Sequence, residues 1–377
     1  MAVGGSITGT VALLLCLSVS RSYSLQWRKG RTKSAGSLTF FRGDVVEIVE
    51  LEQETGLKRF SYDELAATTD NFSDHRKLGE GGFGSVYRGY LEELNLHVAV
   101  KRVARSSRQG WREFMSEVKI ISRLRHRNLV LLIGWCYDGV GDNLLLVYEL
   151  MHNGSMDNHL YHPDPKKQLA WPTRYKIVLG LGSALVYLHH DTEQCVLHRD
   201  IKPSNVMLDA SFNAKLGDFG LARVIDDDGR RSRTTTPAGT MGYMDPECMA
   251  TGRTSVESDV YSFGVVLLEI ACGRCPCRMG ARFTWCSECG SSVAPGGFST
   301  RRTPVSPEIT MSRKWSVCRL WCAHPDRSLR PTIRHAVNIL RFDAPLPSLP
   351  ASMPLIASYV PPAAAGQSIV GVGYRQP

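Results

Sequence analysis

Apolar and polar positions along the first part of the chain predict strands and then a helix. Residues 78–103 combine glycine-rich turn chemistry with alternating apolar and polar side chains, which is typical of two strands joined by a tight turn. In residues 112–124, Phe114, Val118 and Ile121 lie at positions i, i+4 and i+7. This spacing places the three side chains on one face of a helix.

The pattern in the second part of the chain favours helices. A short apolar run at residues 144–148 predicts one more buried strand, and residues 175–189 predict a helix. Residues 259–270 are apolar almost all round, as in a fully buried helix. Ahead of the first strands, Ser61 and Glu64 have the spacing of a capping box at a helix start. Strands followed by helices favour an α+β domain with two lobes.

Both ends of the chain differ in composition from this predicted domain. Residues 1–20 have no charged side chain and an apolar centre, and residues 21–59 form a polar linker with a basic start. The short apolar core is typical of a cleaved signal peptide, but basic residues after an apolar segment are typical of the cytoplasmic side of a membrane anchor. We favour the anchor and keep the signal peptide as the alternative. From residue 343 to residue 377, Pro, Ala, Ser and Gly dominate and predict a disordered tail.

The charge and the cysteine content limit which partners and which redox state we expect. The net charge of +9 over 377 residues raises the question of a nucleic-acid partner. The basic excess comes from two local runs, residues 21–33 and 274–319, and not from one face, so no nucleic-acid partner is expected. Seven of the eleven cysteines lie between Cys272 and Cys322, which is one segment and not a disulfide framework spread over the fold.

A glycine-rich stretch with a nearby lysine points to phosphate binding. Residues 79–86 have the pattern G-x-G-x-x-G-x-V, and glycines let a backbone approach phosphates and offer its N–H groups. The same pattern opens dinucleotide-binding units when a helix follows, but here a strand is predicted. That strand carries Lys101, which can hold phosphate oxygens as a point charge. Glu117 on the next helix is its natural ion-pair partner.

The most specific stretch runs from residue 196 to residue 220 and contains H-R-D-I-K-P-S-N and D-F-G. Within it, the carboxylate of Asp200 can accept a hydroxyl proton, and Lys202 can neutralise phosphate charge. The amide oxygen of Asn205 and the carboxylate of Asp218 are hard oxygen ligands of the kind that Mg²⁺ prefers. The order and spacing of these residues, more than any one of them, indicate phosphoryl transfer.

Together with G-T-M-G-Y-M-D-P-E at residues 239–247 and S-D-V-Y-S-F-G at residues 258–264, these motifs resemble the signature set of eukaryotic protein kinases. The resemblance covers about residues 60–274 and resumes near Leu320. Residues 60–72 are similar to the start of plant receptor-like kinase domains, and the most similar subgroup is the L-type lectin receptor kinases. No lectin ectodomain is expected in this chain.

The resemblance implies a two-lobed protein kinase fold over residues 60–342. Its β-rich N-lobe would span about residues 72–151, and its helical C-lobe about residues 152–342, with a disruption at 275–319. ATP and Mg²⁺ would be its cofactors, and proteins its substrates. The pattern D-x-K-x-x-N around Lys202 resembles the serine/threonine class.

The same resemblance assigns roles residue by residue. The residues implied in ATP binding are Gly79, Gly81, Gly84, Val86, Lys101, Glu117, Glu149 and Met151, with Tyr148 as the gatekeeper before the hinge. Those implied in catalysis are Asp200 and Lys202, and those implied in metal binding are Asn205 and Asp218. Structural roles are implied for Glu247, Asp259 and Arg330. In kinases an arginine at the position of Arg330 pairs with the glutamate of the Pro-Glu motif, which is Glu247 here.

Regulation is expected in the segment between Asp218 and Glu247. Arg199 precedes the catalytic Asp200, and an arginine there can pair with a phosphorylated activation segment and order it. The candidate acceptors in this segment are Thr234, Thr235, Thr236 and Thr240. Phosphorylation is predicted in the run 234–236.

Residues 275–319 interrupt the resemblance. They contain no sustained helical pattern of apolar residues where the family has further C-lobe helices. Three interpretations remain open: a zinc site, a lineage-specific loop, or a reading-frame or exon error that ends before Leu320. The zinc ligands would be Cys275, Cys277, Cys286 and Cys289, although C-x-C is tighter than the common spacing.

Two hypotheses about the function therefore compete, and a third is less favoured. The main hypothesis is a serine/threonine protein kinase in receptor-like signalling, anchored in the plasma membrane by residues 1–20 with its kinase domain in the cytoplasm. A kinase needs cytosolic ATP, which agrees with an anchor followed by basic residues. The alternative is a non-catalytic kinase-like scaffold with a damaged C-lobe, and the third class is a zinc-binding module.

Overall fold

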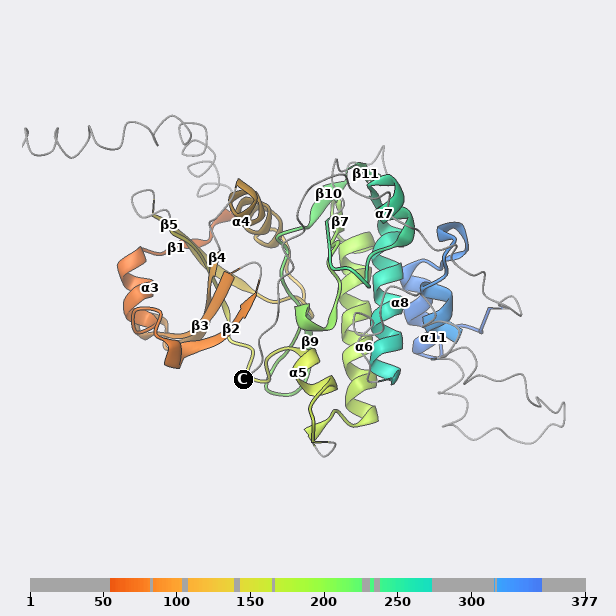
Figure 1. Ribbon diagram of the computed structural model, residues 1–377, viewed down its shortest axis with the longest axis horizontal. Helices are drawn as coiled ribbons and strands as arrows, with labels where there is room; N and C mark the ends of the chain where they lie inside the picture. Colours follow the sequence, from red (N-terminus) through yellow and green to blue (C-terminus); the bar gives the residue numbers. More distant parts are fainter. Residues whose placement is uncertain are drawn as a thin grey trace, which may run out of the picture. The chain divides into compact units, whose positions relative to one another are not determined.

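The computed structural model describes most of the chain after residue 54. It covers residues 55–81, 84–103, 108–138, 143–164, 167–225, 231–233, 238–272, 315 and 317–347. The predicted features that lie outside these ranges are the apolar segment 1–20, most of the linker 21–59, Thr234, Thr235 and Thr236, the four candidate zinc cysteines and most of the tail 343–377. From Lys58 onward, a sheet-rich lobe and a helical lobe follow each other along the chain (Figure 1).

The first lobe is built on a six-stranded sheet with the order β1-β5-β6-β4-β3-β2. Its strands are β1 (Lys58–Arg59), β2 (Lys77–Gly81), β3 (Gly84–Leu91), β4 (Leu96–Val103), β5 (Leu132–Asp138) and β6 (Asn143–Glu149). Residues 78–103 thus contribute to three strands, where the sequence predicts two. The sequence pattern also misses β5, because its residues form a continuous apolar run without the alternation of a half-buried strand.

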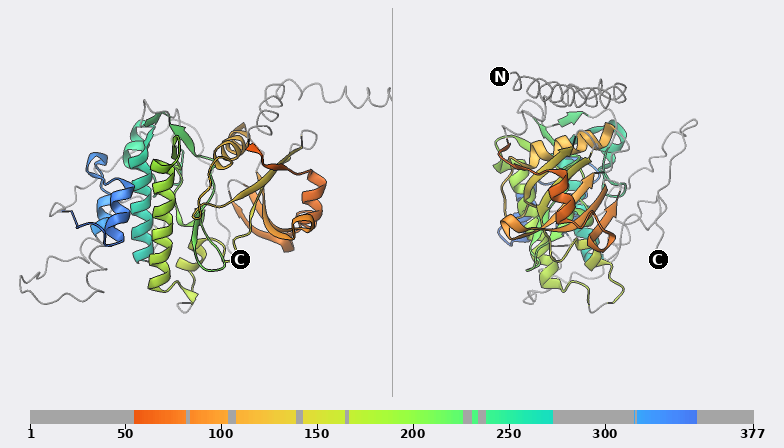
Figure 2. Two further views of the ribbon diagram at one scale, coloured as in Figure 1. Left: turned by 180° about the vertical axis from the view of Figure 1, so that it is seen from behind. Right: turned by 90° about the vertical axis from the view of Figure 1, so that its left-hand side faces the viewer.

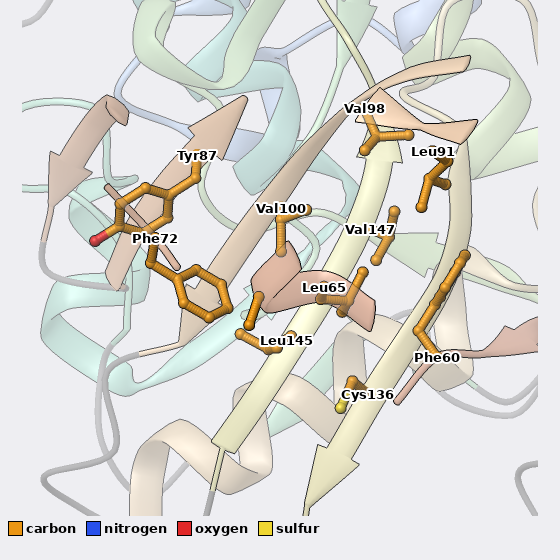
Figure 3. Close-up of a cluster of buried hydrophobic side chains, with 11 residues drawn as sticks. Phe60, Leu65, Phe72, Tyr87, Leu91, Val98, Val100, Cys136, Leu145 and Val147 are labelled. Atoms are coloured by element: carbon orange, nitrogen blue, oxygen red, sulfur yellow. The ribbon is translucent and has the colours of Figure 1, made fainter. Parts of the chain in front are cut away.

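Two helices cover opposite faces of this sheet. Helix α3 (Tyr62–Thr68) begins after Ser61, whose hydroxyl accepts a hydrogen bond from Glu64 N at 3.1 Å, as the capping-box spacing predicts. Its Leu65 packs with Val100, Leu145 and other apolar side chains of the strands (Figure 3). On β5, Cys136 belongs to this cluster, whereas the preceding residue, Trp135, contacts Phe114 of helix α4 (Arg108–Ile121). Successive strand residues point to opposite faces, so α3 and α4 lie on different sides of the sheet.

Strand β1 joins the edge of the sheet through an unusually close approach. It pairs parallel with β5, with Lys58 opposite Gly134 and Arg59 opposite Trp135. A Cβ atom at Gly134 would lie 2.1 Å from the carbonyl oxygen of Lys58 and 2.5 Å from the ring of Phe60. Only glycine therefore allows β1 to reach β5 here.

The second lobe is mainly helical, and α6 (Trp171–Val186) and α8 (Val256–Cys272) lie side by side in it (Figures 1 and 2). The other helical elements are α5 (Met156–Leu160), a π-helical turn (Tyr187–Asp191), η5 (Pro203–Asn205), α7 (Pro246–Thr251), residues 317–322, η7 (Arg327–Leu329) and α11 (Ile333–Leu340). Short strand pairs are β7 (Cys195–Leu197) with β10 (Arg223–Ile225), β8 (Val206–Leu208) with β9 (Ala214–Leu216), and β11 (Arg231–Arg233) with β12 (Arg253–Ser255). The predicted helices at 175–189 and 259–270 are therefore present. Within the described ranges, no helix has both the length and the apolarity needed to cross a membrane.

The C-terminal part of the predicted insert belongs to the packed lobe. Trp315 is 2% exposed, and its ring lies 5.1 Å from that of Trp171 at the start of α6. Cys318, one helical turn further on, is fully buried. These two residues of the predicted insert 275–319 therefore pack in the second lobe. Trp315, Cys318, Arg319 and Cys322 are all buried at the spacing i, i+3, i+4 and i+7, but one of the four is an arginine, so the sequence alone shows no complete apolar pattern.

Candidate active site between the two lobes

The glycine-rich stretch contains the end of β2 and the start of β3, which pair as antiparallel strands. Gly81 pairs with Gly84 where the strands meet, and Gly79 pairs with Val86. Gly84 has a φ of +123°, which side-chain-bearing residues rarely adopt. Val86 lies directly opposite Lys101 on β4. The hairpin thus presents glycine backbone beside the strand that carries Lys101, which is an arrangement suited to phosphate.

Lys101 lies between two carboxylates from other elements. Its Nζ donates to Glu117 Oε2 of α4 at 3.0 Å and to Asp218 Oδ1 at 2.7 Å, so the predicted ion pair with Glu117 is present. Burial alone would lower the pKa of Lys101, but the charges of Asp218 and Glu117 outweigh burial and raise the pKa. Lys101 is therefore a fixed cation next to the hairpin.

The second oxygen of Glu117 is held as well. Tyr148 at the end of β6 donates its hydroxyl hydrogen to Glu117 Oε1, and the backbone N–H of Phe219 donates to the same oxygen at 3.2 Å. Burial, followed by the negative charge of Glu117, raises the pKa of Tyr148, so the phenol stays protonated and remains a donor. Helix α4 is thereby tied to β4, to β6 and to the segment that follows Asp218.

The segment between the lobes contains Glu149 and Met151. The carboxylate of Glu149 accepts hydrogen bonds from Lys215 of β9 at 2.7 and 3.0 Å and from Leu131 N at 2.8 Å. Because these contacts occupy the side chain of Glu149, its contribution to nucleotide binding would come from its backbone. Met151 is buried beside it.

In the second lobe, Asp200 is the centre of a polar cluster. Lys202 Nζ donates to Asp200 Oδ2 at 2.7 Å and to Thr240 Oγ1 at 2.9 Å. Thr240 Oγ1 in turn donates to Asp200 Oδ1 at 2.7 Å. Asn205 Nδ2 donates to the carbonyl oxygen of Asp200 at 2.8 Å and to Asp200 Oδ2 at 3.1 Å. One carboxylate that can accept a proton thus lies beside one cation that can stabilise negative charge.

Asp259 at the start of α8 holds the loop that carries Asp200. Its carboxylate accepts hydrogen bonds from His198 N at 2.8 Å and Arg199 N at 2.9 Å, and His189 Nε2 lies 3.0 Å away. Burial alone would raise the pKa of Asp259, but the hydrogen bond and charge of His189, with smaller contributions from His198 and the Arg199 N–H, lower it. The position of Asp200 therefore depends on a buried, ionised carboxylate.

Asn205 and Asp218 provide oxygen atoms suited to a divalent cation. The two are neighbours, because Gly217 N donates to the carbonyl oxygen of Asn205 at 2.9 Å. Asn205 turns its amide nitrogen toward Asp200, so its amide oxygen points the other way. Burial alone would raise the pKa of Asp218, but the charge and hydrogen bond of Lys101 lower it and keep the carboxylate ionised. A carboxylate and an amide oxygen fit a hard cation.

This geometry agrees with a comparison against known families. Residues 72–340 match the model of the protein kinase domain. The chain belongs to the protein kinase family. Protein kinases in general use ATP and a divalent metal ion, which is the chemistry that the glycine-rich hairpin, Lys101 and the oxygen ligands suit.

The relatives of this kinase are plant receptor kinases, which confirms the resemblance found in the sequence. It is 46% identical over 379 residues to the L-type lectin-domain containing receptor kinase IX.1 of Arabidopsis thaliana, covering 96% of this chain and 55% of that protein. It is 48% identical over 309 residues to the L-type lectin-domain containing receptor kinase SIT2 of Oryza sativa subsp. japonica, covering 80% of this chain and 45% of that protein. The chain spans about half the length of these curated relatives.

The implied pairing of Arg330 with Glu247 in this kinase is wrong. Arg330 Nη2 donates to Asp245 Oδ1 at 2.8 Å, whereas Glu247 lies 3.1 Å from Arg327 near the surface. The physical reason is local: Asp245 is the N-cap of α7, so its carboxylate lies inside the lobe, and Glu247 in the first turn points outward. An Asp-Pro-Glu sequence signals the cap, but not its distant partner.

Two further residues gain roles that the sequence did not show. Among the four threonines predicted for regulation, Thr240 is the one within the described residues, and its hydroxyl lies between Asp200 and Lys202. Tyr148, expected only before the hinge, contacts Glu117 directly. Both contacts join residues far apart in the chain, and no local pattern marks them.

Proposed function

We propose that this chain is a serine/threonine protein kinase that transfers the γ-phosphate of ATP to hydroxyl groups of proteins. The observation that carries the proposal is the cluster of Asp200, Lys202 and Thr240, in which all three side chains contact one another. A carboxylate held by a lysine and a hydroxyl group is positioned to accept the proton of an incoming alcohol. The D-x-K-x-x-N pattern supports an aliphatic hydroxyl as that alcohol.

The residues of the two lobes have complementary tasks in this proposal. Lys101 would bind the phosphates beside the glycine-rich hairpin, and Asp200 would orient and deprotonate the substrate hydroxyl. Lys202 would stabilise the charge of the transferring phosphoryl group. Asn205 and Asp218 would hold Mg²⁺, which when bound neutralises phosphate charge. The segment from Glu149 to Met151 would contact adenine through its backbone.

Arg199 supports regulation by phosphorylation of the activation segment. Its Nη1 donates to the carbonyl oxygen of Leu221 at 3.1 Å, and its buried Nε has no hydrogen-bond partner among the described residues. Arg223 Nη1 donates to the neighbouring carbonyl oxygen of Ala222 at 3.0 Å, and burial and then the charge of Arg223 lower the pKa of Arg199. A phosphate on one of the threonines at 234–236 would neutralise this pair. Phosphopeptide mapping of an active preparation tests this, and three unmodified threonines would contradict it.

We also infer receptor-like signalling at the plasma membrane, with the kinase domain in the cytoplasm. This rests on the relatives, which are named receptor kinases, and on the basic residues that follow the apolar segment 1–20. Carbonate extraction of membranes from cells expressing the full chain tests it. Release of the protein by carbonate would contradict an anchor.

The activity is tested by incubating the full chain with Mg-ATP and a mixture of Ser-, Thr- and Tyr-containing peptides, with intact mass as the readout. Asp200→Asn is the control, because it removes the proton acceptor and conserves size. We expect the Ser- and Thr-containing peptides to gain mass with the wild type. The rate should be about 10²- to 10⁴-fold lower with the variant. Thermal stabilisation by Mg-ATP without any transfer would instead favour the non-catalytic scaffold.

A further inference from the structure

The buried ion pair at the end of the activation segment uses an unexpected carboxylate. The side chains of Arg330 and Asp245 are 0% and 2% exposed, and their atoms Nη2 and Oδ1 are 2.8 Å apart. Arg330 donates three further hydrogen bonds, to the carbonyl oxygens of His324, Pro325 and Glu257 at 2.7–3.0 Å. The guanidinium is therefore fully enclosed, and Asp245 supplies its charged partner.

Asp245 makes two further contacts with the same carboxylate. Its Oδ2 accepts a hydrogen bond from Ser258 Oγ at 2.9 Å, and its Oδ1 caps α7 through Glu247 N at 3.1 Å. Glu247, by contrast, has a side chain that is 34% exposed beside Arg327 at 23%. One acid is thus embedded in three interactions, and the other forms a single surface pair.

A continuous set of contacts connects Asp245 to the catalytic cluster. Ser258, which donates to Asp245, precedes Asp259, which holds the backbone of His198 and Arg199. On the other side, Tyr243 O accepts a hydrogen bond from Ser262 Oγ of α8 at 2.7 Å. The short segment from Thr240 to Asp245 therefore lies between α8 and Asp200.

We propose that Asp245, and not Glu247, is the positioning residue that fixes this segment and thereby holds Thr240 against Asp200. The inference rests on the proposed kinase function, since it assigns a role in that reaction. A fully buried charge must keep its partner, whereas a surface pair is replaced by water at little cost. In this chain, Asp245 therefore has the role of buried partner for Arg330 that the kinase family implies for Glu247.

The first experiment compares Asp245→Asn with Glu247→Gln in the full chain by thermal unfolding. We expect Asp245→Asn to lower Tm by about 10 °C, because it leaves Arg330 buried without a counter-charge. Glu247→Gln should lower it by about 2 °C or less. If Asp245→Asn yields no folded protein while Glu247→Gln does, Asp245 is again the acid whose loss destabilises the protein more. An equal or larger loss for Glu247→Gln would overturn the proposal.

The second experiment separates positioning from stability. Ser258→Ala keeps the ion pair but removes the hydrogen bond to Asp245, together with the one that the hydroxyl accepts from Ser255 N at 3.2 Å. We expect it to lower kcat about fivefold with little change in the KM for ATP, as for residues coupled in one network. In a Thr240→Ala background, the same substitution should change kcat much less, because the hydroxyl that Asp245 positions is already absent. An equal fold-change in both backgrounds, or a change in Tm alone, would mean that the role is only structural.

The two arms also distinguish this inference from the proposed function. If the wild-type chain transfers no phosphate, the proposed function fails and with it the role of Asp245 in positioning Thr240. The thermal comparison requires no catalysis and still decides which carboxylate holds Arg330.

Discussion

Two polar clusters beside the candidate active site are held in different ways. The cross-lobe cluster consists of Lys101, Glu117, Tyr148 and Asp218. The loop anchor consists of Asp259, His189 and the backbone N–H groups of His198 and Arg199. In the first cluster, Lys101 and Asp218 have 13% and 20% of their side chains exposed, and Glu117 has 2%. In the second, His189 and Asp259 have 1% and 2%.

The difference teaches which cluster can open. The four side chains of the cross-lobe cluster come from separate elements, so we expect that a shift of α4 could separate Glu117 from Lys101 without unfolding either lobe. Glu117 is also buried and also accepts a hydrogen bond from a backbone N–H, but its cluster is partly exposed at Lys101 and Asp218. The loop anchor is buried throughout, so opening it leaves an unpaired charge in an apolar interior. We therefore expect the cross-lobe cluster to control activity and the loop anchor to control both stability and activity.

The largest effect should come from Asp259→Asn. The carboxylate of Asp259 accepts hydrogen bonds from His198 N and Arg199 N and lies beside the His189 ring. An amide is neutral and has only one oxygen, so the free energy of unfolding should fall by about 3–5 kcal/mol. Activity should be lost with it, because the loop that carries Asp200 is released. Urea unfolding and kinase assays on the same sample check both. A stable but inactive variant would show that the two clusters do not differ as argued here.

The same anchor predicts a specific sensitivity to acid. The pKa of Asp259 is lower in the folded state than its ordinary value near 4, so the stability it contributes is present above that value and is lost as the pH falls through the lowered pKa. The difference between the unfolding free energies of the wild type and of Asp259→Asn should therefore be smaller at pH 3 than at pH 6. A constant difference over this range would exclude Asp259 as the source.

Lys101→Met should break the comparison from the other side. Loss of the cation should lower the rate of phosphoryl transfer about 10²- to 10³-fold, as for removal of one electrostatic contact to a transition state. Tm should change by only a few degrees, because Glu117 keeps its contacts with Tyr148 and Phe219. Lys176→Met, at an exposed lysine, is the control for removal of a charge. Loss of folding in Lys101→Met would place this cluster with the loop anchor.

Gly134→Ala tests whether the edge strand β1 supports the side of the sheet that carries α4. The new methyl group would collide with the Lys58 carbonyl oxygen and the Phe60 ring. We therefore expect the free energy of unfolding to fall by about 1–3 kcal/mol. Trp135, next to Gly134, contacts both Arg59 of β1 and Phe114 of α4. In Gly79→Ala, where a Cβ would meet no described atom within 4 Å, stability should barely change. Similar unfolding midpoints for both variants would contradict the close approach of β1.

Sequence reasoning predicted the parts of this molecule that depend on local order. The glycine pattern, the D-F-G and H-R-D motifs and the two long helices can be recognised because their residues are neighbours in the chain. The Lys101–Glu117 pair was predictable because the family fixes both positions. Strand β5 was missed, since a run such as Leu-Ile-Gly-Trp-Cys-Tyr has no alternation to mark it.

The contacts that sequence reasoning missed depend on packing. Asp245 and Arg330 are 85 positions apart, and only the cap geometry of α7 decides that Asp245 and not Glu247 turns inward. Thr240 contacts Asp200 because the chain folds back onto that residue, 40 positions away. A motif thus predicts which residue types are present, whereas burial decides which of two similar carboxylates becomes essential.

The smallest effect should come from Tyr148→Phe, which removes one hydroxyl group and leaves the ring. Glu117 keeps Lys101 and the N–H of Phe219, so kcat should fall only severalfold, corresponding to about 1 kcal/mol for one hydrogen bond. Tyr175→Phe is the matched control, because its hydroxyl donates to the carbonyl oxygen of Leu340 and has no contact with Glu117. Both variants should lose similar stability, but only Tyr148→Phe should lose activity. Equal kcat values for the two variants would show that the hydroxyl of Tyr148 does not help to hold α4 in its active position.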